Sequence, residues 1–379
     1  MNNIENPNFV AKKDLHEKTG ERNIYGKEKF SPEKAKEHVE SIIDDFKDYY
    51  SSLGYREENP VLISSGVDST VRFVGSQISV LKPYFLEKRV PTPGIFMRQD
   101  CVRTKNINRF LDEDFMPAWG SYFPNMGAIA PPERIFEGCQ NTFDFFEKKL
   151  QIDPENILIR ISSTDQDLID ACRKRYGDRN LEIDSRDISY YRHKLGIDGV
   201  RGRNCNIALR NSDGEGFSDV GNLIIIENSE SKLCLEMSIG PSTSLKQIFG
   251  LDHVQDCNPV VGLESVDKKF RRKFEDSIIT STVLMREGLR PFGQHNRNRI
   301  LKRYIQSMSY FRSRCAIKTE ELLKIISDFE NREFPKSDIN VSGVMVEFLE
   351  AFENEIVSKK DLTEEQQKIK SALLLLNKK

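Results

Sequence analysis

Two arginines on a short extended run are the first residues whose types and spacing suggest chemistry. In "PYFLEKRVPTPGIFMRQDCVRT" an apolar stretch is interrupted by Pro91 and Pro93 and then continues into a strand-like run that carries Arg98 and Arg103. A guanidinium fixed on a rigid strand can hold a phosphate through two parallel hydrogen bonds. The run therefore predicts an anion site at Arg103, with ordinary solvated arginines as the alternative.

A glycine-rich segment is the second candidate. "GIDGVRGRNCN", Gly196 to Asn206, places three glycines together with Arg201 and Arg203 in eleven residues. Such a composition predicts a loop whose backbone amides can approach a ligand closely. A tight surface loop is the alternative.

A carboxylate near the end of a strand is the third candidate. In "LEMSIGPSTS" Glu236 precedes Gly240 by four residues. The carboxylate could face a substrate ammonium, and the glycine would leave room for a nucleotide. An ordinary turn from strand to helix is the alternative.

A basic helical segment is the fourth candidate. "QHNRNRILKRYI" concentrates four cations within seven residues, which suits a polyphosphate or an RNA backbone. A solvated helix face is the alternative. The four residues are Arg297, Arg299, Lys302 and Arg303.

The composition excludes several other classes of protein. The five histidines form no metal-binding pattern, no phosphate-binding or serine-hydrolase motif is present, and we expect no metal ligands in the chain. The seven scattered cysteines favour reduced thiols in a cytoplasmic protein. The net charge of −2 gives no general case for nucleic-acid binding, and no apolar run is long enough to span a membrane.

The elements that must position these residues change type along the chain. Residues 1–30 are polar and predict a flexible extension or an arm that docks elsewhere on the protein. A helix is predicted from Ser31 as N-cap, with Pro32 at its first position. Strands alternate with helices to about residue 250, and 251–379 reads as all helical. The predicted strands are 156–162, 204–210, 221–229 and 233–240, and the main predicted helices are 165–177, 267–285, 297–314, 318–330 and 341–358.

In this order, the segments resemble the N-terminal half of alanyl-tRNA synthetases, which are class II enzymes. The resemblance covers about residues 31–360 and begins with "GVDSTVRFVGSQISVLKPYFLEKRV", which is similar to the family's first motif. Arg103 matches the arginine of the second motif, and "LEMSIGPST" resembles the third. Further matching positions are Asp68, Thr70, Phe73, Lys82, Phe85, Leu86, Phe115, Gly120, Gly199, Gly202, Ile207, Asn222 and Gly240.

The resemblance implies an α+β fold, in which an antiparallel sheet flanked by helices (31–250) is followed by an all-helical domain on the tRNA side (251–379). It implies ATP and Mg²⁺ as cofactors and a small amino acid as substrate. Arg103 would contact the α-phosphate, Glu236 the ammonium group, and Asn222 would orient the amino acid. Trp119 and Gly240 are further substrate-binding candidates, and the basic helix would contact tRNA.

The departures from the family are informative. The arginine of the third motif is replaced by Thr243, so Lys246, Arg201 and Arg203 become candidate substitutes. Glu236 is one methylene longer than the family's aspartate, which favours an amino acid other than alanine or a different pose. We expect no editing domain and no zinc-dependent deacylation.

Three functions are compatible with these residues. The first is a ligase that activates a small amino acid with ATP and passes it to tRNA, a carrier protein or a small molecule. The second is an acyl transferase that uses aminoacyl-tRNA without adenylation. The third is a synthetase-like protein that binds tRNA or a partner without catalysis.

Overall fold

A single mixed sheet organises the N-terminal part of the chain. The computed structural model describes residues 23–27, 29–185, 188–335 and 338–376. Within these residues nine strands follow the order β1-β2-β3-β9-β8-β7-β4-β5, with β6 paired to β7. Only β1/β2 and β4/β5 pair in parallel among the described strands. The strands are β1 (Arg56–Glu57), β2 (Ile95–Val102), β3 (Tyr122–Ala130), β4 (Ile157–Ser162), β5 (Leu181–Asp184), β6 (Arg192–Lys194), β7 (Arg201–Arg210), β8 (Phe217–Glu227) and β9 (Lys232–Ile239).

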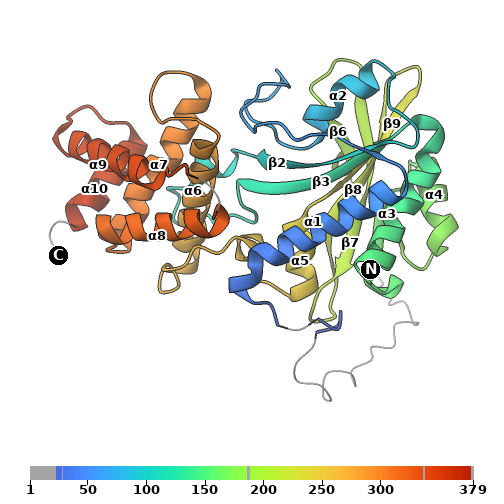
Figure 1. Ribbon diagram of the computed structural model, residues 1–379, viewed down its shortest axis with the longest axis horizontal. Helices are drawn as coiled ribbons and strands as arrows, with labels where there is room; N and C mark the ends of the chain where they lie inside the picture. Colours follow the sequence, from blue (N-terminus) through green and yellow to red (C-terminus); the bar gives the residue numbers. More distant parts are fainter. Residues whose placement is uncertain (1–22, 28, 186–187, 336–337, 377–379) are drawn as a thin grey trace.

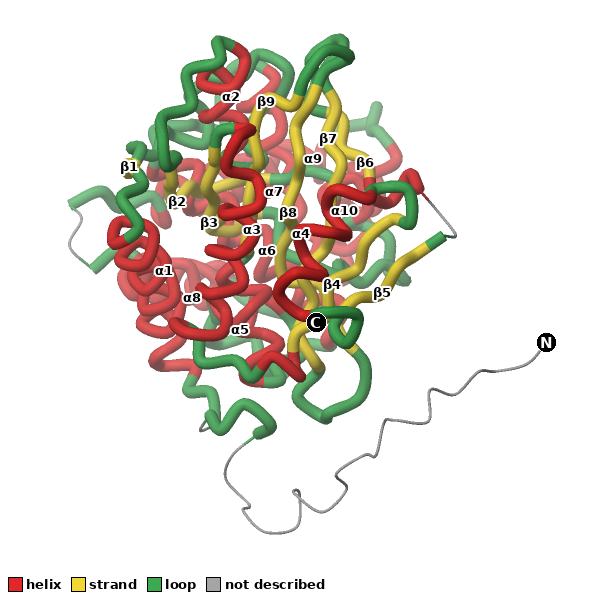
Figure 2. The backbone as a smooth tube through the Cα atoms, turned by 90° about the vertical axis from the view of Figure 1, so that its right-hand side faces the viewer, coloured by secondary structure: helices red, strands yellow, loops and turns green. Residues whose placement is uncertain are grey.

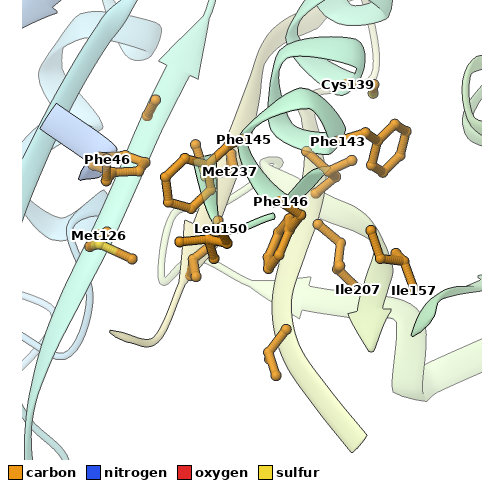
Figure 3. Packing of buried hydrophobic residues seen from close by; sticks show 14 of the residues in the cluster. Phe46, Met126, Cys139, Phe143, Phe145, Phe146, Leu150, Ile157, Ile207 and Met237 are labelled. Atoms are coloured by element: carbon orange, nitrogen blue, oxygen red, sulfur yellow. The ribbon is translucent and has the colours of Figure 1, made fainter. Parts of the chain in front are cut away.

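One face of the sheet is covered by helices along its length. Aromatic side chains of α1 and of the segment after α3 pack against Met126 of β3 and Met237 of β9 (Figure 3), and the whole layer is buried. Alternating strand residues supply the apolar side chains on this face. The covering helices are α1 (Ala35–Ser52), α3 (Ile135–Asp144), α4 (Gln166–Tyr176) and α5 (Pro241–Phe249).

The opposite face is covered only in part. Helix α2 (Ile78–Leu86) and its flanking loops bury Met97, Ile129 and Ile224 at one end of the strands. Figure 2 shows β7, β8 and β9 side by side, with β4 and β5 towards one edge. Away from α2 this face carries polar side chains, which leaves space for a site.

A separate helical region follows the sheet. It has its own apolar core and lies beside the ends of β2 and β3 (Figure 1). The predicted architecture, a largely antiparallel sheet flanked by helices and followed by helices alone, is confirmed. The domain boundaries at residues 30 and 250 stay a prediction. The helices are α6 (Lys268–Arg286), α7 (Asn296–Arg314), α8 (Thr319–Glu333), α9 (Ser342–Ser358) and α10 (Glu364–Leu376).

Two local predictions need correction. The predicted glycine-rich loop is shorter than expected, because β7 begins at Arg201 and includes the second half of that segment. Ser31 stands at the N-cap position and Pro32 comes first, as predicted, but of the 3₁₀ turn Pro32–Lys34, which leads into α1 at Ala35. The Ser31 hydroxyl donates to Glu33 and makes no capping hydrogen bond to the backbone.

The prediction for residues 1–30 falls mostly outside the described residues. Of that segment, the Asn23 side chain donates to the carbonyl oxygen of Ile248, and the Tyr25 hydroxyl donates to that of Arg210. Across the part of the chain that is described, none of the helices has the length and apolar character needed to cross a bilayer.

Candidate functional site

A row of polar side chains crosses the open face of the sheet. Arg160 of β4 pairs with Asn206 of β7, which pairs with Asn222 of β8, which pairs with Ser238 of β9. Residues in register on adjacent strands share a face, so these four side chains lie next to one another. Asn222 and Ser238 of this row line a cavity, whereas Arg160 and Asn206 lie beside it, outside its lining.

A β-bulge adds a carboxylate to this row. Ile207 pairs with Gly221 but Ala208 pairs with Asp219, so Val220 has no partner on β7. A bulge of one residue changes the face to which the following side chains point. Asp219 therefore joins Asn222 in the cavity lining, while Val220 packs into the apolar core.

The cavity has a volume of about 240 Å³ and lies where the sheet, the start of α5 and the first helix of the helical region meet. Its size suits a small polar ligand, or part of a larger one. Amide and hydroxyl groups dominate the polar lining, and Arg103, Asp219 and Asp276 are its charged members. The other polar or aromatic lining residues are Trp119, Tyr122, Phe123, Asn125, Asn222, Ser238, Ser242, Thr243, Gln255 and Asn258.

Arg103 is held in place without an ion pair. Its Nε donates to the carbonyl oxygen of Gly75 at 3.0 Å, and its guanidinium carbon lies 4.9 Å from the centre of the Phe123 ring. Within the described residues no carboxylate lies within ion-pair distance of this guanidinium. Although the side chain is partly open to solvent, desolvation by the nearby protein atoms lowers the pKa of Arg103 from its ordinary value. By contrast, Arg98 pairs with Asp100 at 2.6 Å.

The helical region contributes one wall of the cavity through Asp276 of α6. Its carboxylate accepts from the backbone N–H of Ser121 at 2.7 Å, from the Ser121 hydroxyl at 2.8 Å and from Asn106. Burial raises the pKa of Asp276 to about 6. These bonds join α6 to the loop between β2 and β3, which also carries Trp119, a residue that is 49% exposed.

The structure brings together four of the seven predicted catalytic and substrate-binding residues. Arg103, Trp119, Asn222 and Gly240 line the cavity. Glu236, Lys246 and Arg201 do not line it. Their assignments as site residues stay predictions, but the geometry places them away from the cavity surface.

Glu236 lies on the same face of β9 as Ser238, but it is buried beside the cavity under Gln77. Its side chain is 2% exposed and accepts from Nε2 of Gln77 at 2.8 Å. Gly127 leaves the space for this contact, since a Cβ atom there would lie 2.3 Å from the Gln77 amide. Burial raises the pKa of Glu236 to about 8, so its carboxyl is mainly protonated at neutral pH. A neutral, enclosed carboxyl is poorly suited to hold a substrate ammonium.

The arginines of the predicted glycine-rich loop serve a different contact. Arg203 binds Asp167 and Glu227 at 2.9 and 3.0 Å, and Arg201 binds Glu227 at 3.0 Å. Asn206 lies on the same face of the sheet as the cavity, and successive residues of a strand point to opposite faces. Arg201 and Arg203 on β7 therefore point away from the cavity face. They join strands to α4 instead of facing the cavity.

The predicted tRNA-binding cations lie on the first half of α7 and differ in exposure. Arg297 donates to the carbonyl oxygen of Arg72 at 2.5 Å, and Arg303 binds Asn108 at 3.0 Å and Glu365 at 2.8 Å. The ammonium group of Lys302 lies 5.8 Å from the Phe348 ring centre. Arg299 is exposed, and no described residue pairs with it. The tRNA-binding role of these residues stays a prediction.

Several cavity residues were missed in the sequence. Asn125, Asp219 and Ser238 sit on strands, and Asp276 is on a helix of the second region. A polar residue inside an otherwise apolar strand was an available signal for Asn125 and Ser238. The bulge that turns Asp219 to the cavity face had no signal in the sequence.

Comparisons with known proteins reveal only distant structural similarity. The sequence matches no protein-family model and no curated protein. Solved structures similar to the chain include the protein designated threonyl-tRNA synthetase from Aeropyrum pernix, with 11% identity, 69% of this chain and 74% of that chain covered, and a TM-score of 0.41.

Two further examples are also aminoacyl-tRNA synthetases. The asparaginyl-tRNA synthetase of Pyrococcus horikoshii complexed with asparaginyl-adenylate is 10% identical, with 60% and 68% of the two chains covered and a TM-score of 0.34. The histidyl-tRNA synthetase of S. aureus is 11% identical, with 58% and 72% covered and a TM-score of 0.34. Because these TM-scores are below 0.5, the fold class assigned above rests on the sheet and helices themselves.

Proposed function

We propose that the chain activates a small amino acid with ATP, as a synthetase-like ligase, and passes the acyl group to an acceptor. The observation that carries this proposal is Arg103, which lines a polar cavity and has no carboxylate partner among the described residues. Gly75 occupies its Nε, which leaves the terminal nitrogens free for two hydrogen bonds to one phosphate. The first turn of α5, with Gly240, Ser242 and Thr243 in the lining, favours the same anion through its backbone amides.

The chemistry asks for positioning and charge stabilisation instead of a protein nucleophile. An oxygen of the amino-acid carboxylate attacks the α-phosphorus of ATP, and the bond to the pyrophosphate oxygen breaks, so that aminoacyl adenylate and pyrophosphate form. Arg103 would stabilise the charge that develops on the α-phosphate. The Phe123 ring beside it offers an apolar surface for a planar group.

Mg²⁺ would reach the site together with ATP. Among the described residues no group of three or more histidines, cysteines, aspartates or glutamates could hold a metal ion. Mg²⁺ commonly takes most of its ligands from substrate phosphates and water. Bound in this way, the ion would neutralise the phosphates that Arg103 does not reach.

A second function is favoured by the small number of cations in the cavity. Thr243 lines it where the family has an arginine, and neither Lys246 nor Arg201 reaches it. One guanidinium suits one phosphate better than three. The second candidate is therefore transfer of an acyl group from an aminoacyl-tRNA without adenylation, with tRNA approaching over α7.

Amino-acid-dependent exchange between ATP and labelled pyrophosphate tests the first function. The assay is run with Mg²⁺ over all twenty amino acids and without tRNA. Exchange with one small amino acid would establish adenylation and name the substrate. No exchange by folded protein would reject it, and acyl transfer from charged tRNA would then support the second candidate. Binding of tRNA with neither activity would instead indicate a non-catalytic binding protein.

A further inference from the structure

The bulge in β8 places two acceptor groups on one strand. Val220 is the extra residue, so Asp219 and Asn222 both face the cavity although three positions separate them. On a regular strand, residues three apart point to opposite faces. Bulges commonly redirect a side chain in this way next to functional sites.

Hydrogen bonds fix the direction in which the amides of this group point. The Asp219 carboxylate, paired with Arg160 at 2.6 Å, offers only acceptors, so Asn206 must present its Nδ2, at 2.9 Å. The carbonyl oxygen of the Asn206 side chain therefore faces Asn222 and accepts its Nδ2 at 2.7 Å. The remaining atom, Oδ1 of Asn222, has no donor among the described residues.

The carboxylate also keeps one acceptor position free. Its Oδ2 accepts from Asn206 and from the Tyr190 hydroxyl at 2.6 Å, and its Oδ1 accepts from Arg160. A carboxylate has about four lone-pair positions, and the described donors use three of them. The free position on Oδ1 and Oδ1 of Asn222 thus present two acceptors to the cavity.

We infer that Asp219 and Asn222 bind the ammonium group of the amino acid, and that Glu236 does not. Resting on the function proposed above, this inference assigns the two ends of the cavity: Arg103 takes the phosphate, and the β8 acceptors take the amine. An ammonium supplies three N–H donors, and Asp219 and Asn222 each offer an acceptor, on either side of the Asn206 amide. Arg160 and Tyr190 act as positioning residues, since they hold Asp219 and touch no ligand.

Calorimetry with paired ligands tests the assignment. The probes are glycyl- and alanyl-sulfamoyl adenosine together with their analogues without the amine, acetyl- and propionyl-sulfamoyl adenosine. The full chain should bind the amine-bearing member of a pair at least about tenfold more tightly, the effect of one charge-assisted hydrogen bond. Asp219→Asn should reduce this preference to less than about threefold.

Matched variants separate binding from structure. Glu182 is the other carboxylate that contacts Arg160, at 3.5 Å, and it lies outside the cavity lining. The Glu182→Gln variant should therefore keep the full preference for the amine-bearing probe. Glu236→Gln should also keep it. If Asp219→Asn does not fold, as judged by circular dichroism, Asn222→Leu replaces it and should likewise lower the preference.

The outcomes are distinguishable. An unchanged preference in folded Asp219→Asn, or an equal loss in Glu182→Gln, would overturn the amine assignment and leave the proposed function standing. Loss of the preference in Glu236→Gln would return the amine to that carboxyl. Failure of the wild-type chain to bind any of the four probes would overturn the proposed function and this assignment together.

Discussion

Arg103 and Glu236 shift each other's pKa electrostatically, but their surroundings give them different roles. Arg103 faces the cavity and has no acidic partner within the described residues, whereas Glu236 is enclosed by α2 and bonded to Gln77. A cation without a partner inside a cavity is prepared for an anion, while an enclosed neutral carboxyl serves packing. Substitutions of the two residues are therefore expected to have different effects.

Replacing Arg103 by alanine should lower amino-acid-dependent pyrophosphate exchange at least about a hundredfold, because the charge on the α-phosphate loses its stabilising donor. The melting temperature should change little, since the exposed Arg103 side chain makes one hydrogen bond to the described part of the protein. Arg89→Ala, at an exposed arginine paired with Glu87, is the control and should keep the wild-type rate. A full rate in Arg103→Ala would show that this residue does not contact the reacting phosphate.

The raised pKa of Glu236 predicts a dependence of stability on pH. Between its ordinary value of 4.5 and its native value of about 8, the native state keeps a proton that the unfolded state has lost. The contribution of this group to the free energy of unfolding therefore falls as pH rises through that window, by up to about 1.4 kcal/mol per unit.

Glu236→Gln removes this titration and keeps an oxygen for the Gln77 bond. In urea unfolding from about pH 5 to pH 8, the variant should become progressively more stable than the wild type. Parallel curves over this range would mean that Glu236 is already ionised in the native state, as an ammonium-binding carboxylate would be.

At the scale of elements, the contact between α2 and the sheet depends on a glycine at position 127 of β3. Gly127 of β3 lets the Gln77 amide, just before α2, lie against the strand, where a Cβ atom would come within 2.3 Å. Gly127→Ala should destabilise the protein by about 1–3 kcal/mol, because this buried contact has little room to adjust.

Gly343 provides the matched control for this substitution. It lies in α9, and nothing lies within 4 Å of the position its Cβ would take. Gly343→Ala should stabilise by about 0.5–1 kcal/mol through helix propensity. Equal effects of the two alanines in urea unfolding would contradict the close approach of α2 to β3.

At the scale of the whole molecule, Asp276 joins the helical region to the sheet. Its carboxylate holds both the backbone and the hydroxyl of Ser121, and that hydroxyl also accepts from Tyr304 of α7 at 2.8 Å. The cavity lies at this junction, so its wall depends on contact between two regions with separate cores.

Asp276→Asn should cost about 2 kcal/mol or more, since one acceptor becomes a donor that faces buried donors. Loosening this junction should also separate the unfolding of the two regions, seen as a broader or biphasic urea transition. Asp252→Asn, at an exposed carboxylate paired with Lys268, should change stability by less than about 0.5 kcal/mol. Similar losses of stability in both variants would show that the Asp276 contacts contribute no more than an exposed ion pair does.

Periodicity predicted most of the elements. The apolar run of 221–229 and the helical spacing in 297–314 appear as β8 and α7, since hydrophobic patterning is local and reflects which face is buried. The sequence also predicted Arg103, Asn222 and Gly240 as site residues, because each belongs to a segment that resembles a known motif. All three line the cavity.

The sequence by itself determined β4, β7, β8 and β9, the all-helical second part and the position of Arg103 at the end of a strand, whereas β1, β5, β6 and α3 were not predicted. The tertiary structure alone decided which polar residues share the cavity. Strand pairing brings Asn222 next to Asn206 and Ser238, a bulge turns Asp219 towards them, and helix α6 adds Asp276. The tertiary structure also decided that Glu236 is enclosed, under Gln77. Pairing, register and burial arise from contacts between residues far apart in the chain, and local sequence patterns do not encode them.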